Sequence, residues 1–346
     1  MMLTRHAIVL LGLLGSASAA SAQSFHIEDV PSATALDVAQ LKPNTIAFND
    51  HTGGAAVESD AYLTRFGDWA SKHPNQKKFL SLFPSYTEPA PHAGASDADA
   101  SSGKIYMYVA QARFVLDRAP GSVDLSRYVT LPFLQKIDPA IKHTLITADQ
   151  VVQLRSDGDD GNDNPDRKWC TGRTTSICTM STYKMEGKIP IGILLVNKIR
   201  DSSKKVFDHI DFESELSALT PDDVDQTGVQ QLTALNTPVI GVFEQNIFHV
   251  NELMRFGKFF AVLQDHPSDP NKTVVTAFMA IGIGADLLDK KREYENVPIL
   301  RNMVPAQVLV GQSSFNSGDS ISGGLPKYAR NEIAMVAGIL EQDKGK

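Results

Sequence analysis

Residues 105–116, IYMYVAQARFVL, decide the fold class of this chain. Aromatic and β-branched side chains fill this stretch, which is typical of a long β-strand. Residues 258–264 and 273–285 have a similar character, and they flank the polar, proline-containing loop 265–271. Two strand-like segments on either side of a turn-forming loop predict an antiparallel hairpin.

The remaining patterns predict further strands and a helix at the C-terminus. Residues 189–199 and 303–311 also read as strands, and few long helices intervene, which disfavours a doubly wound parallel sheet. A closing helix is expected over 326–340, with Pro326 in its first turn. Its apolar stripe consists of Ala329, Ile333, Val336 and Leu340. We therefore expect an α+β protein: a mainly antiparallel β-sheet main domain with a small helical N-terminal unit and a C-terminal helix.

The first 22 residues have the layout of a secretory signal peptide. Arg5 precedes the apolar run 7–14, small residues follow, and Ala20-Ser21-Ala22 forms an A-x-A cleavage site. The apolar run is too short to span a bilayer, and no stop-transfer pattern follows it. We expect cleavage after Ala22, no transmembrane segment in the mature chain, and a periplasmic or secreted location.

Three further units are expected after the signal peptide. Residues 23–83 form the small helical unit, because Leu63, Phe66 and Ala70 recur at helical spacing. Residues 84–103 are rich in Pro, Ala, Ser and Asp, which indicates a linker or mobile loop. Residues 104–346 form the β-rich main domain.

Composition restricts the partners that this protein can have. The formal net charge is −7, with 42% apolar and 21% charged residues. The chain lacks a dense cluster of Lys and Arg outside acidic surroundings, whereas a phosphate-backbone binder shows a basic stripe. The sequence therefore argues against nucleic acid as a partner.

The two cysteines, Cys170 and Cys178, both fall in the expected exported part. An even, closely spaced pair in an oxidising compartment predicts one disulfide. The spacing is not the C-x-x-C of redox proteins, so we expect a structural bond.

The Asp-rich segment 155–168 (RSDGDDGNDNPDRK) is the best candidate for a metal site. Its carboxylates offer the hard oxygen ligands that Ca²⁺ prefers. The spacing does not satisfy the EF-hand pattern, so the alternative is a solvated, turn-rich loop. The candidate calcium ligands are Asp157, Asp159, Asp160 and Asp163.

A second acidic cluster begins at His209. On a strand, the side chains at alternate positions would share one face and could hold a metal or perform acid–base chemistry. These are His209, Asp211, Glu213 and Glu215. A charged, solvent-facing surface is the favoured alternative. His249 and Glu252 form a weaker pair without a matching second pair.

The function expected from the sequence is binding rather than catalysis. Neither H-E-x-x-H nor G-x-S-x-G occurs in the chain. We expect a non-catalytic binding or accessory protein of the cell envelope or extracellular space, which engages an envelope protein, a glycan or a lipid. The alternatives are a metal-assisted hydrolase and a structural envelope component.

Overall fold

The computed structural model describes residues 25–51, 64–74, 76, 79, 105–139, 141–155, 169–171, 175–184, 209–250, 254–284 and 321–343. The predicted signal peptide, the predicted linker 84–103 and the predicted strands 189–199 and 303–311 lie outside these residues.

The described strands form one sheet with the order β1-β2-β4-β10-β9-β8-β7-β6-β5, and β3 also pairs with β4. The β1–β2 pair is parallel, and the other described pairs are antiparallel. The chain is thus α+β, as expected from its sequence. The strands are β1 His26–Asp29, β2 Thr45–Asn49, β3 Thr64–Arg65, β4 Ile105–Leu116, β5 Ile141–Leu145, β6 Ser176–Lys184, β7 His209–Leu219, β8 Val239–Val250, β9 Met254–Asp265 and β10 Thr273–Gly284.

The decisive segment 105–116 forms β4 over its full length, and β9 and β10 form the predicted hairpin. These strands are buried along nearly all of their described length, and a run rich in apolar, aromatic and β-branched residues carries its own strand signal. Residues 25–50 add β1 and β2 to the same sheet, so the segment expected to form a helical unit contributes strands as well as helix α1.

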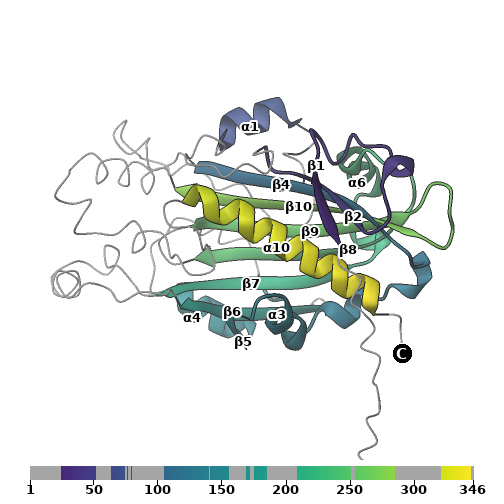
Figure 1. The fold of residues 1–346 in the computed structure, drawn as a ribbon. Helices are drawn as coiled ribbons and strands as arrows, with labels where there is room; N and C mark the ends of the chain where they lie inside the picture. The colour runs from purple at the N-terminus through teal and green to yellow at the C-terminus, as the bar shows by residue number, and fades with distance from the viewer. Residues whose placement is uncertain are drawn as a thin grey trace, which may run out of the picture.

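One long helix crosses a face of the sheet (Figure 1). This helix, α10, spans Ile321–Gln342, so the predicted terminal helix is present and begins five residues earlier than expected. Pro326 lies inside α10 and not in its first turn, because residues 321–325 are already helical. The shorter helices are α1 Phe66–Lys72, α3 Leu131–Ile137, α4 Ala148–Arg155 and α6 Gln226–Thr233.

The C-terminal end of α10 is tied to the turn after β4. The guanidinium of Arg118 donates to the Leu340 carbonyl at 2.6 Å, and the N–H of Asp117 donates to Glu341 at 3.0 Å. Nearer the start of the helix, Arg330 lies 2.5 Å from Asp29 Oδ1, so α10 also contacts the end of β1. These contacts hold α10 across the sheet.

The opposite face of the sheet is covered too. Trp69 and Phe79 are buried there, and the Phe79 ring lies 5.2 Å from that of Phe260. The sheet thus has two packed faces, and only the face beneath α10 carries the cavity described below. None of the described helices is long and apolar enough to cross a membrane.

Candidate ligand-binding cavity

A row of small side chains runs across the sheet beneath α10. Ala277 on β10 is paired in register with Ala112 on β4 and with Ala261 on β9. The row ends in a phenylalanine on each side, since Phe48 on β2 pairs with Ala112 and Phe243 on β8 pairs with Ala261. Three adjacent methyl side chains leave a depression in a surface that larger side chains border.

Helix α10 covers this depression without filling it, and a cavity of about 110 Å³ results. The three alanines line it from the sheet, and three of the four residues of the predicted apolar stripe of α10 line it from the helix. Most of the wall is apolar, and this set includes Leu134, Ile137, Ile141, Phe259, Met279, Ala329, Ile333 and Val336. A mostly apolar, concave wall with a few polar groups is typical of small-molecule sites.

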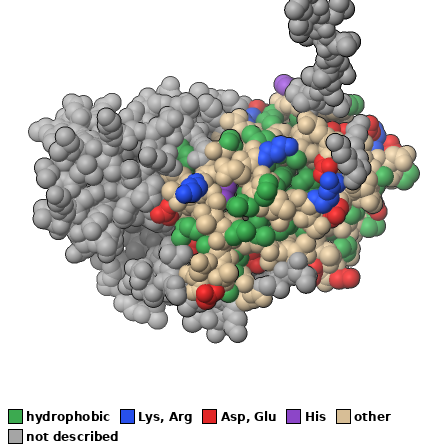
Figure 2. All heavy atoms as spheres, turned by 90° about the horizontal axis from the view of Figure 1, so that it is seen from below, with side chains coloured by type: hydrophobic (Ala, Val, Ile, Leu, Met, Phe, Trp, Pro, Cys, Tyr) green, Lys and Arg blue, Asp and Glu red, His purple; other side chains and the backbone are tan. Residues whose placement is uncertain are grey.

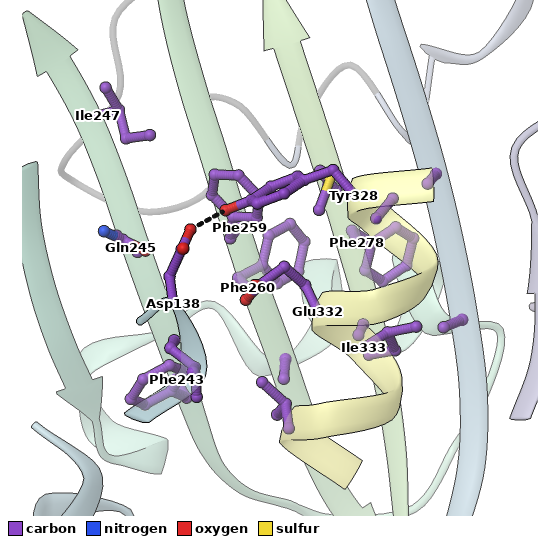
Figure 3. Close-up of a pocket in the computed structure, with 18 of the residues that line it drawn as sticks. Asp138, Phe243, Gln245, Ile247, Phe259, Phe260, Phe278, Tyr328, Glu332 and Ile333 are labelled. Atoms are coloured by element: carbon purple, nitrogen blue, oxygen red, sulfur yellow. Dashed lines mark hydrogen bonds between the residues drawn. The ribbon is translucent and has the colours of Figure 1, made fainter. Parts of the chain in front are cut away.

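Two acidic side chains and a tyrosine form a polar cluster in this wall (Figure 3). Tyr328 and Glu332 occupy successive turns of α10, and Asp138 follows the last residue of α3. The Tyr328 hydroxyl donates a hydrogen bond to Asp138 Oδ2 at 3.4 Å. The cluster therefore joins the helix above the cavity to the helix beside it.

The surroundings of this cluster change its acid–base chemistry. Burial, and then the nearby charge of Asp138, raise the pKa of Glu332 to about 8. Burial and the charges of Glu332 and Asp138 raise the pKa of Tyr328 as well. Glu332 therefore holds its proton at neutral pH and offers an O–H donor to the cavity, which an ionised carboxylate cannot do.

A second polar region lies on the sheet. His143 on β5 and Gln245 on β8 both line the cavity, and burial lowers the pKa of His143, so its imidazole is neutral at pH 7. The described lining residues include no Lys or Arg. The cavity thus combines an apolar body with neutral hydrogen-bonding groups and the carboxylate of Asp138.

The structure confirms the predicted disulfide between Cys170 and Cys178, whose Cα atoms are 5.8 Å apart. Cys178 lies in β6, and Cys170 lies in a turn with a positive φ of 61°. The candidate calcium ligands fall outside the described residues, and so the calcium prediction stays open. They are Asp157, Asp159, Asp160 and Asp163.

The acidic cluster of β7 does not line the cavity. Asp211, Glu213 and Glu215 alternate with Phe212, and it is Phe212 that faces the cavity. The favoured interpretation as a solvent-facing surface is wrong for Glu213 and Glu215, which are 0% and 5% exposed, because both faces of the sheet are covered.

Within the described part of the chain, no three His, Cys, Asp or Glu side chains are grouped so that they could hold a metal ion. The side chains of His209 and His249 lie outside that part.

Sequence reasoning missed the polar groups of the cavity. Tyr328 and Glu332 are four residues apart and adjoin the predicted apolar stripe of α10. A polar pair at this spacing beside the stripe could have predicted polar groups on the buried side of the helix. Asp138 and His143 had no comparable signal, because only the folded chain brings them to α10.

The surface carries no concentration of one charge in the view of Figure 2, where hydrophobic side chains lie among scattered basic and acidic ones. Leu145 on β5, at 53%, is the more exposed of the two large hydrophobic side chains that stand out among the described residues. The described surface in this view therefore lacks the basic stripe of a nucleic-acid binder.

Comparisons with known proteins give remote structural likenesses. No family model matches the chain, and no curated protein matches it. Zhui aromatase/cyclase from Streptomyces sp. R1128 is 7% identical with a TM-score of 0.33, over 68% of this chain and 95% of that one. Norcoclaurine synthase from Thalictrum flavum is 9% identical with a TM-score of 0.28, over 72% and 96%.

Human STARD10 is 6% identical with a TM-score of 0.26, over 71% of this chain and 80% of that one. These likenesses are too remote to assign a family or a function.

Proposed function

We propose that this chain is an exported binding protein that holds an apolar small molecule or lipid chain between α10 and the sheet. The observation that carries this proposal is the in-register row Ala112, Ala277 and Ala261, which lines a cavity beneath α10. Close packing is the rule for protein interiors, and a row that leaves such space beneath a helix suits an occupant.

The chemistry of the wall distinguishes among the partner classes expected from the sequence. A glycan needs many polar contacts around its ring hydroxyls, and this wall is mostly apolar. A protein partner would engage an exposed surface and not an interior cavity. An apolar ligand with a polar group beside Tyr328 and Glu332 agrees best with the lining.

Export is part of the same proposal. The signal-peptide layout of residues 1–22 supports it, and the disulfide between Cys170 and Cys178 suits an oxidising compartment. The proposed role is thus to hold or carry an apolar compound in the periplasm or outside the cell.

Acid catalysis on a bound molecule is a second candidate, favoured by one observation. A carboxylic acid with a pKa of about 8 in a cavity has the protonation state that a general acid needs at neutral pH. Under this candidate, Glu332→Gln would abolish conversion of a cavity ligand while leaving its binding intact.

Binding of the neutral fluorophore 1-aminoanthracene to the mature protein tests the proposed function. We expect its emission to rise on binding and to fall when ethylbenzene competes for the cavity. Ala277→Phe places a ring in the alanine row and should weaken binding of the fluorophore at least about tenfold, since an aromatic ring removes most of the space.

A matched control separates the cavity from the surface. Leu145→Phe introduces the same side chain at an exposed position of β5 that does not line the cavity, and its binding should equal that of the wild type. Ala261→Phe fills the row from the next strand and covers the case in which Ala277→Phe does not fold. If folded Ala277→Phe and Ala261→Phe both bind like the wild type, the proposed function is wrong.

A further inference from the structure

One ring nitrogen of His143 is hydrogen-bonded, and the other has no hydrogen-bond partner among the described residues. Its side chain lines the cavity and is 8% exposed. Its Nδ1 lies 2.8 Å from the hydroxyl of Ser181 on the neighbouring strand β6. Its Nε2 is buried and has no hydrogen-bond partner among the described residues. A buried polar atom without a hydrogen bond destabilises the folded protein, and a ligand atom that bonds to it removes this cost.

A chain of buried hydroxyl groups leads from His143 across the sheet. The Ser181 hydroxyl lies 3.3 Å from that of Thr179, which lies 3.1 Å from that of Ser214 on β7. All three residues are 0% exposed. The chain ends at Gln245 on β8, whose Nε2 donates to the Ser214 hydroxyl at 3.1 Å.

The amide at the end of this series of hydroxyl groups favours one direction of donation along it. An amide NH₂ only donates, so the Ser214 hydroxyl accepts from Gln245. In the arrangement that continues from this bond, Ser214 donates its hydroxyl hydrogen to Thr179. In the same arrangement Thr179 donates to Ser181, and Ser181 donates to Nδ1 of His143. A neutral imidazole that accepts at Nδ1 carries its proton on Nε2, and so His143 presents an N–H donor.

We propose that the Nε2–H of His143 is a subsite for a neutral acceptor oxygen, a carbonyl or an ether, on the apolar ligand. This inference rests on the proposed function, because it names the ligand chemistry of the same cavity. An anionic head group is disfavoured, since the Asp138 carboxylate lines the cavity and the described lining residues include no Lys or Arg.

The first test compares two probes of nearly the same shape, acetophenone and ethylbenzene, which differ in a carbonyl group against a methylene group. Both are titrated by displacement of 1-aminoanthracene from the wild type and from His143→Phe. We expect His143→Phe to weaken acetophenone about three- to tenfold more than ethylbenzene, the range of one neutral hydrogen bond. An equal effect on both probes overturns the subsite.

The second test needs no change to His143. The nitrogen chemical shifts of the His143 ring in the unliganded wild type report which nitrogen is protonated, and we expect Nε2. Ser214→Ala interrupts the hydroxyl chain and should shift part of the population to the other tautomer. Ser217→Ala is the matched control, since Ser217 is on the same strand, buried at 1% and not part of the chain. Protonation at Nδ1 in the wild type overturns the proposal.

The outcomes separate this inference from the proposed function. If the wild type binds ethylbenzene and its response to acetophenone does not depend on His143, the cavity binds apolar ligands and only the subsite is wrong. If neither probe displaces 1-aminoanthracene, or the fluorophore itself does not bind, both proposals fail together.

Discussion

The hydroxyl of Tyr328 donates to Oδ2 of Asp138 at 3.4 Å and so joins the middle of α10 to the end of α3. Glu332, one turn further along α10, lines the same cavity. This relationship makes α10 more than a cover for the sheet. Because α10 packs on the sheet, the carboxyl group of Glu332 is buried, and burial raises its pKa.

Glu332→Gln should change how stability depends on pH. The folded protein holds the Glu332 proton up to about pH 8, whereas the unfolded chain releases it near the ordinary value of 4.5. The wild type therefore loses stability as pH rises from about 4.5 to about 8, because the folded state binds the extra proton. Glutamine does not titrate, so the variant should gain stability relative to the wild type over this window, by on the order of 2–4 kcal/mol at pH 9.

Urea unfolding at pH 4.5, 7 and 9 measures this difference. Asp222→Asn removes an exposed carboxyl and serves as the control. Its free energy of unfolding should differ little from that of the wild type at each pH. Parallel profiles for wild type and Glu332→Gln would show that Glu332 titrates normally.

Arg113→Met should destabilise the fold strongly. Arg113 is 1% exposed, and its guanidinium donates to the carbonyls of Thr34, Leu36 and Thr233. The substitution leaves these carbonyls without their donor, and we expect a loss of about 3 kcal/mol or more in the free energy of unfolding.

Arg127→Met is the matched control for this prediction. Arg127 is exposed and pairs with Asp343 at 3.4 Å, so its loss should cost less than about 1 kcal/mol. Urea denaturation of both variants measures the two effects. Similar losses of unfolding free energy in the two variants would mean that the hydrogen bonds of Arg113 to the three carbonyls do not stabilise the fold.

The disulfide should leave no titratable thiol in the mature protein. Untreated protein, unfolded in denaturant, should react with no thiol reagent, and one or two labelled cysteines would contradict the bond. The double variant Cys170→Ala and Cys178→Ala should unfold with roughly 2.5 kcal/mol less free energy, the chain-entropy value for an eight-residue separation. Reduced wild type should match that variant.

Calcium should raise the melting temperature if the Asp-rich segment binds it, because a ligand that binds the folded state stabilises it. Melting curves in EDTA and in excess Ca²⁺ test this, with a variant in which all four candidate ligands are Asn as the control. Identical melting curves for the wild type in EDTA and in Ca²⁺ would show that this segment does not bind calcium in the folded protein. The four positions are Asp157, Asp159, Asp160 and Asp163.

Local patterns predicted the main elements of the fold. The strand at 105–116 and the β9–β10 hairpin are rich in aromatic and β-branched residues, and the terminal helix has a periodic apolar stripe. Each of these signals lies within the element's own residues. The pairing of Cys170 with Cys178 followed from their spacing and from the expected compartment. The burial of Glu213 and Glu215 was not predictable in this way, because it depends on what covers the second face of the sheet.

The cavity could not be predicted from local sequence patterns, because it also depends on how distant segments pack together. Ala112, Ala261 and Ala277 are ordinary residues of their strands, and they form a row only through the register of three strands. Asp138 and His143 reach the same space from two other elements. Sites built from such long-range register have no signature in any one segment.

The most direct test of the account locates a bound probe in the folded protein. Nuclear Overhauser effects are measured between ethylbenzene and the methyl groups of protein labelled at Ala and Met. We predict contacts with the methyls of Ala112, Ala261 and Ala277, and none with Met335, which is 37% exposed. Contacts confined to methyls outside the cavity, or no contact at saturating ethylbenzene, would contradict the claim that this protein holds an apolar ligand beneath α10.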